Sequence, residues 1–180
     1  MSRIRITGGE WRSRLIRVAD APGLRPTPDR VRETLFNWLG QDLAGFHCLD
    51  LFAGSGILGF EAASRGAASV VLVERDQGAV ATLRQNCTVL GASQLVVTRA
   101  DALEFAALAA GQGRRFDLTF VDPPYRQGWL DRLWPALAKI TAAGASLYVE
   151  AEAPVTAPTP WRIKRVGKAG QVHYHLLERE

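Results

Sequence analysis

The sequence predicts an α/β domain in which helices cover a mostly parallel β-sheet, with an antiparallel hairpin at the C-terminal end. From residue 46 onward, short apolar runs alternate with amphipathic stretches of helical period, as in units of strand, helix and strand. Two further apolar runs near the end of the chain are separated only by a glycine-containing turn, which is typical of a hairpin. Of the 180 residues, 47% are hydrophobic and 22% are charged, the composition of a single globular domain.

The chain begins with a short basic arm. We divide the protein into this N-terminal arm, residues 1–24, and a main domain, residues 25–180, which we expect to form one globular unit. In the arm, alternating runs at residues 3–6 and 15–18 are broken by glycines and predict a small hairpin with little core of its own.

Apolar stripes and capping residues locate the helices. Helices are expected at residues 28–39, from the cap Asp76 to the stop Gly91, at residues 102–109 and at residues 130–140. In the first of these, Thr27 offers an N-cap and Pro28 takes the first helical position, where its missing N–H has no cost. Asp101 offers the N-cap of the third helix.

Short apolar runs between these helices predict the strands. The parallel strands are expected at residues 48–52, 70–74, 95–98, 116–121 and 146–150. The hairpin strands are expected at residues 161–166 and 172–177, joined by a turn at 167–170. His173 and His175 alternate on the last strand, and we expect them at the protein surface.

The excess positive charge of the chain lies in its first 32 residues. These hold eight arginines and three acidic residues, whereas the other 148 hold 14 basic and 15 acidic ones, for a net charge of +4. A basic arm on a neutral body is typical of a protein that binds a polyanion. A solvated, arginine-rich leader without a partner would give the same count.

Membrane insertion and Sec-type export are not expected. No apolar run approaches the roughly 20 residues that a membrane-spanning helix needs, and the charged start has no apolar signal stretch behind it. The two cysteines, Cys48 and Cys87, stand far apart without any metal-ligand spacing, so neither a disulfide framework nor a structural metal site is indicated. We therefore expect a cytoplasmic protein that needs no metal.

A glycine-rich turn follows the strand predicted at 48–52. Gly54, Gly56 and Gly59 have the spacing of the dinucleotide-binding fingerprint, and Glu74 ends the next strand about 20 residues further on. Such glycines let a ligand approach the backbone at a helix N-terminus, and the acid can bind ribose hydroxyls. The fingerprint alone admits NAD, FAD or another adenosine cofactor, and a tight turn without a ligand would have the same spacing.

Asp50, four residues before the first glycine, favours a cationic ligand over a dinucleotide. Its carboxylate would repel a pyrophosphate but can accept hydrogen bonds from an ammonium group. S-adenosylmethionine carries a sulfonium, an α-ammonium and ribose hydroxyls but no phosphate, so it suits Asp50 and Glu74 together. Asp101, followed by Ala102 after the third strand, is placed to reach the adenine edge besides capping a helix.

The segment predicted to carry the chemistry is Asp122-Pro123-Pro124-Tyr125, at the end of the fourth strand. The two prolines stop the strand and remove two backbone donors, which leaves an acceptor-rich turn at the carboxyl edge of the sheet. An exocyclic base amine needs acceptors for both of its N–H bonds before it can attack a methyl group. The Asp122 carboxylate and the Pro123 carbonyl supply them, and Tyr125 offers a face on which a flipped-out base can stack.

With these motifs the sequence resembles the class I S-adenosylmethionine-dependent amino-methyltransferases. Along nearly its whole length it resembles the bacterial family that methylates the N2 amine of a guanine in 16S ribosomal RNA (the RsmD type). The stretches that carry the resemblance are residues 8–12, 23–36, 49–56, 121–125 and 170–172. The first two are the more informative, because the glycine turn and Asp-Pro-Pro-Tyr occur in many amino-methyltransferases. Tyr125 stands where this family often has Phe, so the motif does not by itself distinguish guanine from adenine.

The resemblance implies a Rossmann-like sheet of seven strands and a monomer that acts on 16S rRNA within an assembling 30S subunit. It implies that the methyl donor is held by Thr27, Asp50, Phe52, Ala53, Gly54, Gly56, Glu74, Asp101 and Ala102. Thr27 and its neighbours would close over the methionine end of the donor. RNA phosphates would be held by Arg3, Arg5, Arg12, Arg14, Arg25, Arg30 and Arg32, which supply affinity rather than base choice.

Three alternative functions are weighed against this one. A DNA adenine-N6 methyltransferase would share the chemistry, but 180 residues leave no separate target-recognition domain. An NAD-dependent reductase would use the glycine fingerprint, yet the sequence has no Tyr-x-x-x-Lys relay. A non-catalytic RNA-binding module would have no need of an intact Asp-Pro-Pro-Tyr.

Overall fold

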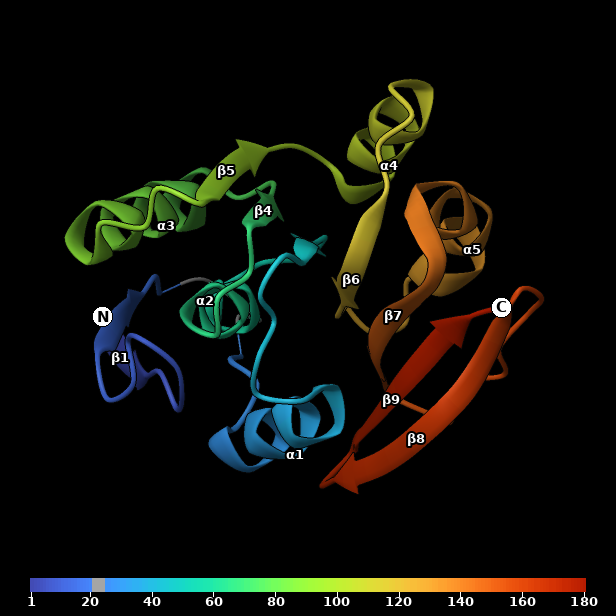
Figure 1. The fold of residues 1–180 in the computed structure, drawn as a ribbon, viewed down its shortest axis with the longest axis horizontal. Coiled ribbons are helices and arrows are strands. Elements are labelled where there is room, and N and C mark those ends of the chain that lie inside the picture. Colours follow the sequence, from blue (N-terminus) through green and yellow to red (C-terminus); the bar gives the residue numbers. More distant parts are fainter. Residues whose placement is uncertain (21–24) are drawn as a thin grey trace.

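The computed structural model describes residues 1–20 and 25–180, and in these residues a seven-stranded sheet forms the centre of the molecule (Figure 1). Its strands are β3 (His47–Asp50), β4 (Ser69–Glu74), β5 (Leu95–Arg99), β6 (Phe116–Val121), β7 (Thr141–Ala151), β8 (Trp161–Ala169) and β9 (Val172–Arg179). Across the sheet the order is β5-β4-β3-β6-β7-β9-β8; the first five are parallel, and β9 is antiparallel to β7 and β8. The predicted fold class, a mostly parallel Rossmann-like sheet with a C-terminal antiparallel hairpin, is confirmed.

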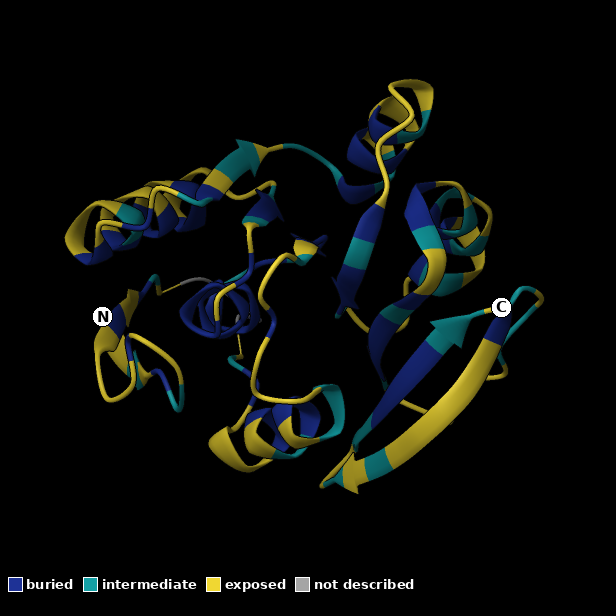
Figure 2. Cartoon of the chain, in the orientation of Figure 1, coloured by how far each residue is buried: buried dark blue, intermediate teal, exposed yellow. Residues whose placement is uncertain are grey.

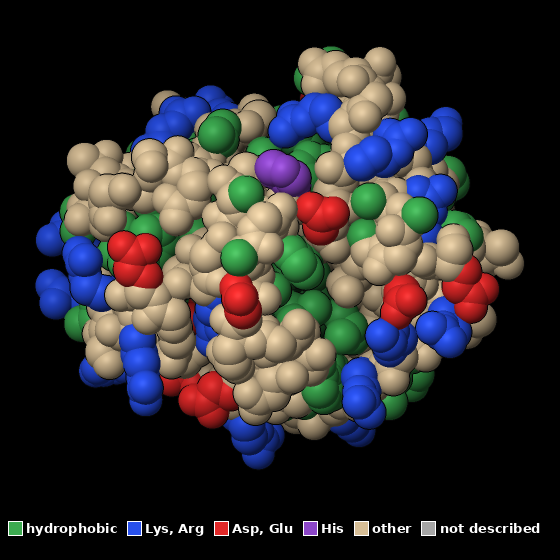
Figure 3. All heavy atoms as spheres, in the orientation of Figure 1, with side chains coloured by type: hydrophobic (Ala, Val, Ile, Leu, Met, Phe, Trp, Pro, Cys, Tyr) green, Lys and Arg blue, Asp and Glu red, His purple; other side chains and the backbone are tan. Residues whose placement is uncertain are grey.

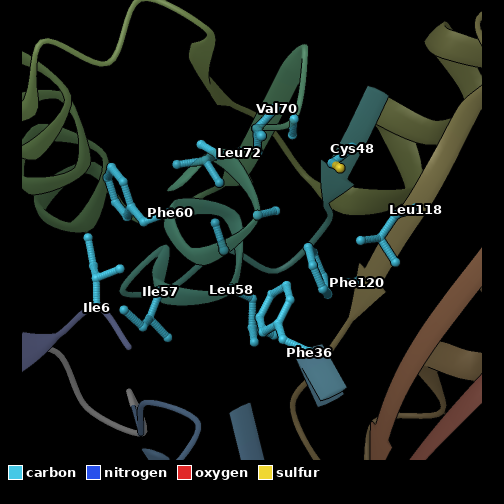
Figure 4. Close-up of a cluster of buried hydrophobic side chains, with 14 of the residues drawn as sticks. Ile6, Phe36, Cys48, Ile57, Leu58, Phe60, Val70, Leu72, Leu118 and Phe120 are labelled. Atoms are coloured by element: carbon cyan, nitrogen blue, oxygen red, sulfur yellow. The ribbon is translucent and has the colours of Figure 1, made fainter. Parts of the chain in front are cut away.

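Helices cover both faces of the sheet. One face carries α1 (Asp29–Leu39), α2 (Ile57–Ser64) and α3 (Gln77–Leu90), and the other carries α4 (Ala102–Gly111) and α5 (Trp129–Ile140). Because successive side chains of a strand point to opposite faces, β3 contributes Cys48 to the first core and Leu49 to the second. Figure 4 shows the first core, where Phe36 of α1 and Phe60 of α2 lie over the sheet. No helix of the described residues has the length and apolar character to cross a membrane.

The N-terminal arm packs on the main domain. Its strands β1 (Ser2–Arg5) and β2 (Leu15–Val18) form the predicted antiparallel hairpin. Ile6 and Trp11 of the arm are buried in the first core, so the arm and the main domain share one hydrophobic core. Gly9, with φ 76°, approaches α2 so closely that a Cβ would lie 2.0 Å from the Ser64 carbonyl oxygen. Helix α2 is therefore covered on its outer side as well, and all eight of its residues are buried (Figure 2).

Buried charges join the arm to α1 and α2 in what we call the Glu61 cluster: Thr7, Arg32, Glu61 and Arg65. Glu61 is fully buried and accepts hydrogen bonds from the backbone nitrogen (2.9 Å) and Oγ1 (2.6 Å) of Thr7. It also accepts from Nη1 of Arg32 (2.8 Å) and Nη1 of Arg65 (2.9 Å). Each buried charge thus has the partners that it needs away from water.

The structure corrects the predicted start of the first helix. Helix α1 begins at Asp29, and Pro28 holds the cap position without a side-chain hydrogen bond. Thr27 is therefore not the N-cap. Its hydroxyl donates instead to Oε1 of Glu150, 123 residues away, because Thr27 lies against the sheet rather than above the first turn of the helix.

Several strand limits also differ from the prediction. Strand β3 ends at Asp50, two residues early, and β7 already begins at Thr141. The hairpin turn is shorter than the expected 167–170, because β8 continues as far as Ala169. Gly167 pairs with Tyr174 across the hairpin, and the tyrosine ring would lie 2.2 Å from a Cβ at that position. The glycine therefore serves to admit an aromatic ring rather than to form the turn.

His175 is buried in β9, and the prediction that it lies at the surface is wrong. Both ring nitrogens have a backbone partner: Nε2 accepts a hydrogen bond from the Val155 backbone nitrogen (3.1 Å), and Nδ1 lies 3.2 Å from the Val149 carbonyl oxygen. A neutral imidazole, with one acceptor and one donor nitrogen, suits these two partners. Burial lowers the pKa of His175, and the charge of His173 lowers it further, against the opposing effect of the Val149 carbonyl.

Acidification is expected to destabilise the protein through His175. The unfolded chain takes up a proton on histidine near its ordinary pKa of 6.5, but the folded chain resists it, so stability present above that pH is lost as the pH falls below it. Urea unfolding of the wild type and His175→Gln at about pH 7.5 and 5.5 tests this, since the variant should lose less stability than the wild type. His47→Gln, at an exposed histidine on β3, serves as the control. An equal pH dependence in the wild type and His175→Gln would contradict the assignment.

Candidate active site

Three carboxylates gather at the carboxyl edge of the central strands. Asp50 ends β3, Asp122 follows β6 and Glu150 lies near the end of β7, and these three strands are neighbours in the sheet. Val121 pairs with Val149, which brings Asp122 next to Glu150. Open parallel sheets bind their ligands at this edge, so the fold unites the two predicted acids and adds a third.

The glycine turn between β3 and α2 is held by Glu74. The backbone nitrogen of Gly54 donates to Oε1 of Glu74 (3.1 Å), and that of Asp76 donates to Oε2 (2.7 Å). Gly54 and Gly56 have φ values of 55° and 78°, and a Cβ at Gly56 would lie 2.4 Å from Leu83. The turn thus places backbone and a fixed carboxylate together at the N-terminal end of α2, where a ligand can approach closely.

Asp50 is buried, with only 2% of its surface exposed. Burial raises its pKa to about 7, and the negative charges of Glu74 and Glu150 contribute to the rise, although the N–H groups of Phe52 and Gly59 oppose it. Ionising a carboxyl group in this position costs free energy because it is buried beside other negative charges. A positively charged ligand next to Asp50 would offset that free-energy cost.

Asp122 occupies the turn after β6 with its side chain half-buried. Burial raises the pKa of Asp122 well above its usual value, and Glu150 raises it further by its charge and by hydrogen bonding. The charge of Asp50 adds to the same effect. The following Pro123 is buried, whereas Tyr125 keeps 39% of its surface exposed and can offer its ring to a ligand.

A cavity of about 320 Å³ lies beside this turn. It is lined by Pro123, Pro124 and Tyr125, by Trp129 and Trp134 of α5, and by residues 150–156. Its volume lies at the lower end of the range of small-ligand sites, about 300–1,000 Å³, and apolar walls with a few polar groups suit a planar heterocycle. The far side of the turn is anchored, because the Arg126 backbone nitrogen donates to Oε1 of Glu152 (2.9 Å).

Glu150, which the sequence analysis did not single out, completes the acidic edge. It is 5% exposed, and its Oε1 accepts hydrogen bonds from Oγ1 of Thr27 (2.9 Å) and the hydroxyl of Tyr148 (2.7 Å). Thr27, a donor-site residue by resemblance, is thereby held at the same edge. The sequence did hold a signal for Glu150. This residue ends the strand predicted at 146–150, which follows the strand at 116–121 along the chain, and parallel strands end at a common edge of the sheet.

The remaining donor-site candidates flank the carboxylates. Asp101 caps α4 by accepting from two backbone N–H groups of that helix, at 2.9 and 3.2 Å, through Oδ1 alone, which leaves Oδ2 for a ligand. Ala102 is buried next to it. Phe52 packs edge-on against Trp129 with ring centroids 5.2 Å apart, and Ala53 is joined to β4 by its backbone nitrogen.

The arginines assigned to RNA lie at the surface, with one exception. Arg3, Arg5, Arg12, Arg14, Arg25 and Arg30 are exposed. Arg32 is fully buried; besides Glu61 it donates to the carbonyl oxygens of Arg5 (2.9 Å) and Thr27 (3.0 Å). The prediction that Arg32 holds an RNA phosphate is therefore wrong, because its guanidinium is bound inside the protein. Figure 3 shows the Lys and Arg side chains of the visible face in separate groups around its rim.

The acidic edge has no basic counterpart within residues 1–20 and 25–180. No lysine, arginine or histidine there forms an ion pair with Asp50, Asp122 or Glu150. Such a buried set of carboxylates suits a ligand that brings its own positive charge. S-adenosylmethionine fits this set, since its sulfonium and ammonium groups are cationic and its ribose hydroxyls can donate to Glu74. The same residues contain no group of three or more His, Cys, Asp or Glu arranged for a metal ion.

This fold and this site define a methyltransferase with a Rossmann-like sheet. The chain belongs to the family described as Conserved hypothetical protein 95, whose model matches residues 4–178, and the resemblance to the RsmD type is confirmed. It is 45% identical over 183 residues to Ribosomal RNA small subunit methyltransferase D of Escherichia coli (strain K12), covering 99% of this chain and 91% of that protein. The Haemophilus influenzae protein of the same name is 38% identical, with 97% and 93% covered. Among solved structures, the putative methyltransferase yhhF from Escherichia coli is similar with a TM-score of 0.90, at 45% identity over 99% of both chains.

Proposed function

We propose that this protein transfers the methyl group of S-adenosylmethionine to the exocyclic N2 amine of a guanine in 16S ribosomal RNA. The observation that carries the proposal is the meeting of Asp122 to Tyr125 with Asp50 and the glycine turn at one edge of the sheet. The relatives named as small-subunit rRNA methyltransferases match nearly the whole chain and support the substrate class.

The chain's own residues would bind and orient both substrates. S-adenosylmethionine supplies a methyl group on a positively charged sulfur. Asp50 would hold the cationic part of this donor and Glu74 its ribose, and Thr27, bonded to Glu150, lies at the same edge of the sheet. The Asp122 carboxylate and the Pro123 carbonyl accept the two N–H bonds of the target amine, while Tyr125 stacks on the base. Much of the rate then comes from alignment, because a positioned amine attacks far more often than one free in solution.

We extend the proposal to the setting of the reaction. The substrate would be the assembling 30S particle, modified by a monomer in the cytoplasm, and residues 1–24 and 25–180 would act as one unit. The buried contacts of the arm with α2 support the last point. The six exposed arginines, which are those of the predicted RNA-binding residues other than Arg32, would hold RNA phosphates.

The test is an assay with methyl-labelled S-adenosylmethionine and 30S subunits from cells that lack this enzyme, with DNA offered in parallel. Digestion of the products to nucleosides should place the label in N2-methylguanosine of the 16S RNA. Label in N6-methyladenine of DNA would keep the chemistry but overturn the substrate. If neither the RNA nor the DNA is labelled, the NAD-dependent reductase and the non-catalytic RNA-binding module become the alternatives. Calorimetry with NAD and with S-adenosylmethionine then distinguishes them.

The exposed arginines of the arm are expected to make RNA binding salt-dependent. Changing Arg3, Arg5, Arg12 and Arg14 together to Gln should weaken RNA binding and lower the slope of log affinity against log salt by about 0.7 for each phosphate that the variant no longer neutralises. The matched control is Arg114→Gln with Arg115→Gln, two exposed arginines just before β6, at the opposite end of that strand from Asp122. An unchanged slope in the arm variant would contradict the role of the arm.

A further inference from the structure

The cavity beside the turn of residues 122–125 is lined by one basic and one acidic side chain that touch each other and that the proposed mechanism does not use. Arg126 follows the turn, and Glu152 is the first residue after β7. The Arg126 backbone nitrogen donates to Oε1 of Glu152 at 2.9 Å, and Nε of Arg126 lies 3.7 Å from Oε2. Both residues therefore border the same space as Tyr125.

The backbone of Arg126 has a conformation that is unusual for an arginine. Its φ is 62°, in the left-handed region that residues with a Cβ seldom occupy. The hydrogen bond from its backbone nitrogen to Glu152 holds it there. Backbone strain of this kind costs free energy and is found most often at functional sites, so it is a first indication that the placement of Arg126 serves a ligand.

Both side chains keep hydrogen-bonding capacity for a ligand. The Arg126 side chain is 91% exposed, and its guanidinium donates no hydrogen bond within residues 1–20 and 25–180. The 3.7 Å from Nε to Oε2 is too long for a hydrogen bond, so Oε2 of Glu152 accepts none from the described part of the chain. A carboxylate oxygen can accept more than one hydrogen bond, and a guanidinium has several N–H donors. The pair thus presents an acceptor and a donor side by side at the wall of the cavity.

Glu152 also lies close to the groups that would hold the target base. The strand that carries Glu150 is the neighbour of the strand that ends before Asp122, and Glu152 follows Glu150 by two residues. Burial raises the pKa of Tyr125, and the negative charges of Asp122, Glu150 and Glu152 raise it further. The acceptor turn, the ring predicted to stack on the base and the Glu152 carboxylate therefore surround one space.

Guanine and adenine differ in the atoms next to the amine that would be methylated. In guanine, the N2 amine is followed along the base edge by N1–H, a donor, and then by O6, an acceptor. In adenine, the N6 amine is followed by N1, an acceptor, and then by C2–H, which is a poor hydrogen-bonding group. An enzyme that takes a base out of the stack reads it by this edge. A carboxylate beside an arginine complements the guanine edge and repels the adenine edge.

We propose that Glu152 and Arg126 select guanine as the base, with the Glu152 carboxylate accepting from N1–H and the Arg126 guanidinium donating to O6. This rests on the proposed function and extends it, because Tyr125 does not distinguish guanine from adenine. An adenine in the cavity would place the lone pair of N1 against a carboxylate and would leave Arg126 without its acceptor. The pair thus supplies base choice, whereas the acceptors of residues 122–125 supply the chemistry.

The test uses 30S subunits in which the methylated guanine, once the labelling assay has located it, is replaced by 2,6-diaminopurine. This base keeps the N2 amine but has an acceptor at N1 and an amine at position 6. The wild type should prefer guanine by about 100-fold or more in kcat/KM. Glu152→Gln can turn its amide N–H toward the N1 acceptor, so its activity on guanine should fall and its preference for guanine should shrink by about tenfold or more.

Arg126→Met tests the other half of the pair with 2-aminopurine, which has the N2 amine but no oxygen at position 6. The variant should lower kcat/KM about tenfold for guanine and leave it nearly unchanged for 2-aminopurine. A loss of the same size for both bases would assign Arg126 to an RNA phosphate and overturn its role in base choice. Asp131→Asn removes a negative charge from another exposed residue of the cavity wall and is the matched control, which should keep the full preference for guanine.

The outcomes separate this inference from the proposed function. If the wild type forms no N2-methylguanosine, the proposed function is refuted and the inference with it. If the wild type methylates guanine and Glu152→Gln keeps the same preference between guanine and 2,6-diaminopurine, the inference alone is overturned. If Glu152→Gln does not fold, as urea unfolding would show, the comparison of guanine with 2-aminopurine in Arg126→Met decides it.

Discussion

Replacement of Asp122 by alanine is expected to lower the rate of methyl transfer by about 100- to 10,000-fold while S-adenosylmethionine still binds. In the proposed mechanism the carboxylate is one of two acceptors for the N–H bonds of the amine, so its loss removes one of the groups that position and activate the amine. The proposed donor site consists mainly of Asp50, Glu74 and the glycine turn, and the bond from Gly54 to Glu74 that holds this turn does not involve Asp122. Single-turnover rates with 30S subunits and calorimetry with the donor measure the two effects separately.

The direction of the stability change gives an independent check on the same residue. Burial, together with the nearby charges of Glu150 and Asp50, raises the pKa of Asp122, so the ionised form of Asp122 is costly in the folded protein. Asp122→Asn removes a charge of the same sign as its neighbours, so it should be at least as stable to urea as the wild type while inactive. The matched variant Asp117→Asn, at the far end of the strand that Asp122 follows, should keep activity. Equal losses of transfer and donor binding in Asp122→Ala would refute the assigned role.

The sequence was enough to single out Asp50 and Asp122 as candidate site residues, but not to show how the edge of the sheet around them is held. Asp50 was found by its spacing to the glycine turn, and Asp122 was found as the first residue of Asp-Pro-Pro-Tyr after a predicted strand. Glu150 ends the strand predicted at 146–150 and was overlooked because no known motif surrounds it. What the sequence could not contain is the bond from Thr27 to Glu150 across 123 residues, which depends on the closed sheet.

Arg32 shows why charge counts mislead at single positions. The count over the first 32 residues treats each arginine alike, but Arg32 shares a helical face with the buried Leu35 and Phe36, three and four residues on. The helical period therefore places Arg32 on the apolar face of α1, which predicts that its side chain is buried. Its partner Glu61 lies in α2, all of whose residues are buried. No local pattern in the sequence predicts that this helix carries a buried charged residue.

Replacing Glu61 by alanine is expected to cost about 3–5 kcal/mol of folding free energy, the largest stability loss that we predict. The change leaves Arg32 and Arg65 buried without their shared counter-charge and removes the acceptor of the Thr7 backbone and hydroxyl. For a chain of this size it corresponds to a fall in Tm of about 6–20 °C. Urea and thermal unfolding measure it directly.

Asp29 supplies the control for this prediction, since it is the exposed acidic partner of the same Arg32. The Asp29 side chain is 65% exposed, and Arg32 keeps Glu61 and two carbonyl oxygens as partners without it, so Asp29→Ala should cost no more than about 1 kcal/mol. Combining Glu61→Ala with Arg32→Met should cost less than the sum of the two changes, because the second removes one of the charges that the first leaves unpaired. A Glu61→Ala loss as small as that of Asp29→Ala would mean that the arm and α1 are held by apolar contacts alone. A large loss would instead show that the buried charges hold the arm, α1 and, through the Thr27 carbonyl, the segment at the acidic edge in one arrangement.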